Sequence, residues 1–229
     1  MSPMRILAAL LAAHLAFLAP DCAAAPFGVQ IGNTRLVMDT PPGFTNTIDI
    51  ASPRLQDLAA TLTASSNRVL VFGLTDEDYR KFTLGDPAEF RRYLIAVTSR
   101  GAESENLSIE VFGKMTEESL RGLGEIVKPP DLIVFLETQP IGRKHLLAQL
   151  RKEPTVVSVM QTARLPPLPG RRFFDSSTPQ YEVTSETLML VRGKALRFSI
   201  FSLYNSPADT DWLRATTERW IDELRRLNR

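Results

Sequence analysis

Alternating apolar and polar positions predict two β-hairpins, one near each end of the chain. The first covers residues 27–39 and turns at residues 32–33, where the order Gly-Asn suits a type II′ turn. The second covers residues 178–204 and turns at residues 192–194. Its second arm alternates regularly, so one side of that strand is apolar and the other polar. Both ends of the chain are therefore expected to pair in antiparallel fashion.

Residues 155–160 also predict a strand. Two other segments, residues 68–73 and 93–97, are short, continuous apolar runs without alternation. Strands of this kind are usually covered on both faces, so we expect them in the interior of a sheet with layers on either side.

Helical periodicity follows four helix-start signals, at Ser52, Thr75, Ser108 and Ser206. Proline follows the first and the last of these serines, as is common at the first helical position. Asp78 lies three residues after Thr75, which indicates a capping box. From Ser108 on, five apolar residues fall on a common side and predict a buried stripe: Val111, Phe112, Met115, Leu123 and Ile126.

Residues 131–152 support more than one interpretation. We favour a helix interrupted at Pro140, with RKHLLAQLRK (residues 143–152) as its clearest part, and an extended linker at residues 164–170. Hairpins beside doubly covered strands predict an α+β fold, a mostly antiparallel sheet flanked by helices, as one domain over residues 26–229.

Residues 1–25 have the pattern of a secretory signal peptide. Their apolar stretch, residues 6–18, would reach only about 20 Å as a helix, short of the roughly 30 Å of a hydrocarbon core. An uncleaved anchor helix is the alternative. Cys22 follows Pro20-Asp21, which is unlike the small apolar run before a lipoprotein cysteine, so we expect cleavage after Ala24 or Ala25 and no lipidation. The mature chain would hold no cysteine, which favours a bacterial periplasm over a disulfide-forming eukaryotic route.

Composition narrows the classes of partner. The 229 residues carry a formal charge of +1, and hydrophobic residues make up 44% of them. This is ordinary for a globular protein, and the absence of a basic excess argues against nucleic acid as a partner. No apolar stretch after the leader is long enough to span a bilayer.

Few residues after the leader suit catalysis or metal binding. His145 is the one histidine there, which excludes multi-histidine zinc sites, and the lack of cysteine excludes thiolate sites. No nucleophile elbow, phosphate loop or dinucleotide fingerprint occurs. We therefore expect no cofactor and no metal. A non-catalytic binding or accessory protein of the cell envelope is favoured, and a carboxylate-dependent hydrolase of carbohydrate or peptide remains open.

Five cations flank or belong to the late hairpin: Arg171, Arg172, Arg192, Lys194 and Arg197. We expect the last three to gather on one side of its tip. Grouped cations bind phosphate or carboxylate groups, so the hypothesis is a site for an anionic surface or envelope partner. The competing interpretation is a solvated hairpin tip.

Two motifs carry a resemblance to a known family. The first is the corner Pro41-Pro42-Gly43-Phe44, which follows the first hairpin. The second is ALRFSIFSLYNSPADTDWLRATTERWIDEL (residues 195–224), a hairpin arm leading into a capped helix. In these features the chain resembles the PsbP-like superfamily, which has a bacterial periplasmic branch and a Ran-binding nuclear transport branch. The resemblance implies an αβα sandwich and an accessory or binding role without catalysis, and it transfers no active-site residue. The longer region over residues 131–172 departs from the family pattern.

Overall fold

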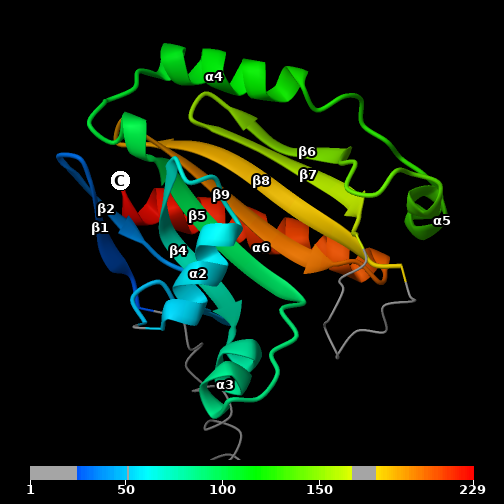
Figure 1. Cartoon of the computed structure of the whole chain (residues 1–229). Helices are drawn as coiled ribbons and strands as arrows, with labels where there is room; N and C mark the ends of the chain where they lie inside the picture. The colour runs from blue at the N-terminus through cyan, green and yellow to red at the C-terminus, as the bar shows by residue number, and fades with distance from the viewer. Residues whose placement is uncertain (1–24, 51, 167–178) are drawn as a thin grey trace, which may run out of the picture.

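The structure, a computed structural model, describes residues 25–50, 52–166 and 179–229 (Figure 1). Residues 1–24 of the predicted leader, including Cys22, lie outside the described residues, as do Arg171, Arg172 and most of the predicted linker.

A seven-stranded antiparallel sheet in the order β3-β4-β5-β9-β8-β7-β6 forms the centre of the fold. Its strands are β3 (Phe44–Asn46), β4 (Asn67–Thr75), β5 (Arg92–Ser99), β6 (His145–Glu153), β7 (Val156–Arg164), β8 (Tyr181–Val191) and β9 (Lys194–Leu203). A separate two-stranded sheet consists of β1 (Phe27–Ile31) and β2 (Thr34–Met38). The helices are α2 (Pro53–Thr61), α3 (Asp76–Leu84), the 3-10 turn η2 (Arg100–Ala102), α4 (Ile109–Arg121), α5 (Leu132–Glu137) and α6 (Pro207–Leu227). The α+β class with helices flanking an antiparallel sheet is thereby confirmed.

Helix α6 covers one face of the sheet, which we call the back face (Figure 1). It begins as predicted, because the Asp209 carboxylate accepts a hydrogen bond from the Ser206 N–H at 3.2 Å. The Trp220 ring packs against Phe198 of β9, with centroids 4.7 Å apart. The buried side chains of α6 form one stripe: Leu213, Thr217, Trp220, Ile221 and Leu224. The larger hydrophobic core lies between this stripe and the sheet.

The β1-β2 hairpin is confirmed and packs beside α6. Gly32 has a positive φ of 55° while Asn33 does not, in keeping with the II′ turn expected there. Asn228, after the end of α6, accepts a hydrogen bond from the Val37 N–H at 2.9 Å and donates one to the Val37 carbonyl at 2.7 Å. The two ends of the described chain are therefore joined.

Helices α2 and α4 cover parts of the opposite face, the front face. Leu55 and Ala59 of α2 are buried against Phe72 and Leu74 of β4, in a second core. The stripe predicted along residues 108–126 is partly wrong. Phe112 is buried, but Val111 and Met115 are 46% and 43% exposed. Helix α4 ends at Arg121, and its buried residues are Phe112 and Thr116. The side of α4 that packs on the sheet is therefore narrow, and the apolar residues next to it face solvent.

The helix expected over residues 143–152 is wrong, because all but the first two of these residues belong to the edge strand β6. β6 pairs with β7, and the pairing shifts register between Leu146 and Ala148 and again between Gln149 and Arg151. Each shift breaks the two-residue alternation of a strand, so the leucines recur at a spacing that imitates a helix. Only residues 132–137 of the ambiguous region are helical, as α5.

Among the described residues, no helix combines the length and the apolar character needed to cross a membrane.

Candidate functional site

The front face is hollowed between α2 and β8. We call this hollow the front-face cavity; its volume is about 230 Å³, and side chains of α2, β4, β5, β8 and β9 contribute to its lining. Antiparallel pairing brings these strands together, and residues at alternate positions face the same way. The cavity is therefore a product of sheet register and not of any local motif.

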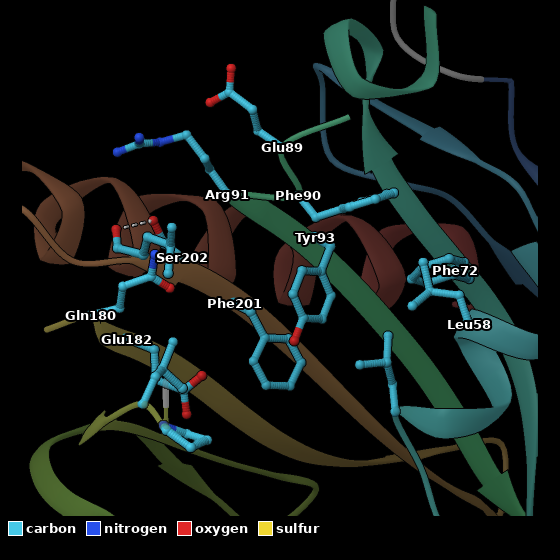
Figure 2. A pocket seen from close by; sticks show the side chains of 14 residues that line it. Leu58, Phe72, Glu89, Phe90, Arg91, Tyr93, Gln180, Glu182, Phe201 and Ser202 are labelled. Atoms are coloured by element: carbon cyan, nitrogen blue, oxygen red, sulfur yellow. Dashed lines mark hydrogen bonds between the residues drawn. The ribbon is translucent and has the colours of Figure 1, made fainter. Parts of the chain in front are cut away.

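Two stacked aromatic rings form the floor of the cavity (Figure 2). Tyr93 of β5 and Phe201 of β9 are register partners, and their ring centroids lie 4.5 Å apart at an interplanar angle of 16°. Leu58 and Leu62, at the α2 side, add an apolar wall. A flat apolar group could pack on these rings, and few polar atoms of the protein would lose contact with water when it did so.

Phe90, another lining residue, has an unusual backbone conformation. Its φ is 50°, in the left-handed region that a bulky L-residue rarely adopts. The Phe90 side chain packs against the core formed by α2 and β4, which holds the residue in place. Strain of about 1–3 kcal/mol is typical of such residues and occurs most often at functional sites.

Glu182 of β8 is the acidic group on the β8 side of the cavity. Burial raises the pKa of its carboxyl, Lys144 opposes that rise, and Glu186 adds to it. The Lys144 ammonium is itself paired with the Glu186 carboxylate, its Nζ 2.6 Å from Oε1. No ion pair to Glu182 is formed within the described part of the chain.

Two buried polar atoms lie in the row next to Glu182. Gln161 of β7 and Thr184 of β8 are register partners, and they are 3% and 1% exposed. Neither Gln161 Oε1 nor Thr184 Oγ1 has a hydrogen-bond partner among the described residues. Unpaired buried polar atoms are rare in folded proteins and call for an explanation.

The other carboxylate of the cavity does not converge with Glu182. Glu89 and Arg91 extend away from the paired rings in Figure 2, and Glu89 contacts Lys81 of α3 at 3.3 Å. A glycosidase places its two carboxyl groups on either side of one scissile bond. Glu89 and Glu182 lack that arrangement, so no observation in the cavity favours the hydrolase interpretation.

His145 does not belong to the cavity. It lies on β6 with its ring edge-on to Phe135 of α5, the centroids 5.1 Å apart. Burial, followed by the nearby Arg143, lowers the pKa of its imidazole. Across the described ranges, no group of three or more histidine, cysteine and acidic residues could hold a metal ion.

The structure does not bring the predicted cation cluster together. Lys194 is 1% exposed, and its Nζ donates to the carbonyls of Glu103 at 2.9 Å and Glu105 at 2.7 Å. Arg197 is exposed on the front face, where it lines a hollow beside α4, while Arg192 donates from Nη1 to a backbone carbonyl of β2 at 3.2 Å. The expectation that all three share one side of the hairpin tip is therefore wrong, because strand alternation sends positions 194 and 197 to opposite faces.

Comparison with known proteins shows a distant likeness only. No family model matches the chain, and no curated protein matches it. Among solved structures, the chain is similar to the Ran-binding protein Mog1p of Saccharomyces cerevisiae, with a TM-score of 0.39 and 10% identity over 89% of this chain and 94% of that one. A mutant of the protein Mog1 matches with a TM-score of 0.38 and 10% identity over 89% of this chain and 95% of that one. Likeness at this level carries no argument about function, and the PsbP-like resemblance stays a prediction.

Proposed function

We propose that this chain is an exported binding protein of the cell envelope that holds an apolar group of its ligand or partner in the front-face cavity. The leader supports export, as argued from the sequence. The stacked pair Tyr93 and Phe201 is the observation that carries the binding role.

The cavity has the features of a preformed site. Aromatic and aliphatic side chains dominate its lining, and a small number of polar groups, Glu182 among them, stand at one side. Ligand sites in proteins combine these features, with the polar groups setting orientation. The volume of about 230 Å³ lies below the usual range for drug-sized ligands, so a small ring or a single side chain of a partner is the group we expect.

A titration with 2-phenylethanol tests this role. Amide chemical shifts of the isotope-labelled protein are expected to move around β5 and β9 and not elsewhere. Leu58→Trp places an indole in the cavity and is expected to abolish those shifts. Leu120→Trp is the matched control, since Leu120 is also a partly buried leucine but lines the hollow beside α4. Binding that survives Leu58→Trp, or shifts that appear mainly beside α4, would reject the cavity as the site.

The proposed location has its own test. Intact mass of the natively expressed protein, measured on soluble and membrane fractions, is expected to show a start at Ala25 or Pro26 in the soluble fraction. A mass that begins at Cys22 and includes acyl chains would instead show a membrane-tethered lipoprotein and would make other envelope components within its reach the first partners to examine.

A further inference from the structure

The β8 side of the front-face cavity presents one carboxylate, that of Glu182, beside the aromatic floor. Glu182, Thr184 and Glu186 occupy alternate positions of β8, so their side chains leave the sheet on the same face. Gln161 joins them from β7, directly opposite Thr184. Of these four side chains, that of Glu182 lines the front-face cavity, Glu186 lines the hollow beside α4, and Gln161 and Thr184 are buried between them.

The charges at this end do not balance. Lys144 lowers and Glu186 raises the pKa of the Glu182 carboxyl, and Arg91, which also lines the cavity, extends away from the paired rings in Figure 2. The Lys144 Nζ is paired with Glu186 at 2.6 Å, so the Glu182 carboxylate has no ion pair within the ranges that the structure describes. A half-buried carboxylate without an ion pair is unfavourable, and the direction of its pKa shift agrees with that cost.

The neighbouring acceptors are also unsatisfied. Gln161 Oε1 is buried and receives no hydrogen bond from any described residue, and the same holds for Thr184 Oγ1. Both atoms have almost no accessible surface and neither residue lines the cavity, so the polar group that a ligand meets on the β8 side is the Glu182 carboxylate. An anionic ligand would add to the negative charge at Glu182 and is therefore disfavoured.

We propose that the cavity binds the amine group of a small organic cation at Glu182, while the apolar body of that ligand lies on the rings of Tyr93 and Phe201. An ammonium supplies a positive charge and three donors, which matches a carboxylate that has no ion pair among the described residues. The ring faces also attract a cation, with the strongest effect where water is excluded. This assignment of ligand class rests on the proposed binding function of the cavity.

Three probes of one shape separate the ligand class from the binding role: 2-phenylethylamine, 2-phenylethanol and 3-phenylpropionate. Each is titrated at pH 8 and followed by amide chemical shifts. A charge-assisted hydrogen bond contributes enough for the amine to bind about ten-fold or more tightly than the alcohol. The propionate is expected to bind most weakly.

Glu182→Gln keeps the size of the side chain and removes its charge. In this variant the amine is expected to lose its advantage over the alcohol. Glu125→Gln, at an exposed position after α4, removes one negative charge elsewhere and is expected to keep the advantage.

Each outcome decides a different claim. If none of the probes binds, the binding function and the ligand class both fail. If the alcohol binds as tightly as the amine, or the propionate binds best, the cavity is a binding site but not for cations. If the amine still binds more tightly than the alcohol in Glu182→Gln, Glu182 is not the group that recognises the amine. If that variant does not fold, the three probes on the parent protein still decide the ligand class.

Discussion

Trp220 gives a sharp test of how α6 is seated on the sheet. The ring is 1% exposed, and its Nε1 donates to the carbonyl of Asp39 at 2.8 Å. Trp220→Phe keeps an aromatic ring but leaves that buried carbonyl without its donor, at a cost of about 1–3 kcal/mol. The smaller ring also leaves a void, which adds roughly 1 kcal/mol. We expect the free energy of unfolding to fall by about 2–4 kcal/mol in total.

Urea unfolding measures this loss, which corresponds to a midpoint shift of about 1 M or more for a protein of this size. Trp212→Phe is the matched control on the same helix. Trp212 is partly exposed, and the guanidinium of Arg92 stacks on its ring at 4.0 Å. Its replacement is expected to cost less than about 1 kcal/mol, since phenylalanine keeps a face for that cation. Equal shifts for the two variants would refute the seating of α6 described above.

Three further perturbations have expected outcomes that urea unfolding can check. Asn228→Ala removes both hydrogen bonds to β2 and is expected to cost about 1–2 kcal/mol, whereas Arg229→Ala, one residue later, should have little effect. Gly73→Ala places a Cβ 2.6 Å from a leucine side chain of β5 and should destabilise the fold, whereas Gly113→Ala within α4 meets nothing within 4 Å and should stabilise it by about 0.5–1 kcal/mol. Folding raises the pKa of the Glu182 carboxyl above its unfolded value of about 4.5, so the folded protein favours the protonated form. The stability that this carboxyl contributes is therefore present below the unfolded pKa and is lost as the pH rises through the folded pKa. Glu182→Gln should therefore be more stable than the parent at pH 8 and equal to it near pH 4; a parent protein that is the more stable at pH 8 would contradict the burial argument.

Local signals predicted the elements whose hydrogen bonds close within a few residues. The turn at Gly32 and the cap at Ser206 are set by backbone geometry and by side chains that bond to their own neighbourhood. The Thr75 cap belongs to the same group, since its hydroxyl accepts from the Asp78 N–H at 3.1 Å. The same kind of reasoning predicted a helix wrongly for residues 143–152. Leucine, lysine and glutamine favour a helix in isolation, but pairing with β7 overrides that preference.

Candidate chemistry was harder to predict than the fold. Grouping by nearness along the chain selected Lys194 and Arg197, which strand alternation separates. Glu182 showed a weak signal, since it is an acidic residue at the start of a strand that is otherwise largely buried. That signal did not show which residues would face it, because those come from other strands.

The sequence by itself determined the antiparallel hairpins, the helix caps and the apolar sides that α6 and the sheet bury against each other. These depend on interactions within one element or across one turn. The tertiary structure alone decided that Tyr93 would stack on Phe201, that Gln161 would lie opposite Thr184, and that Glu182 would form no ion pair with the other described residues. Each of these pairings depends on the order and register of strands that are distant along the chain, and a shift of one residue would turn every side chain concerned to the other face of the sheet.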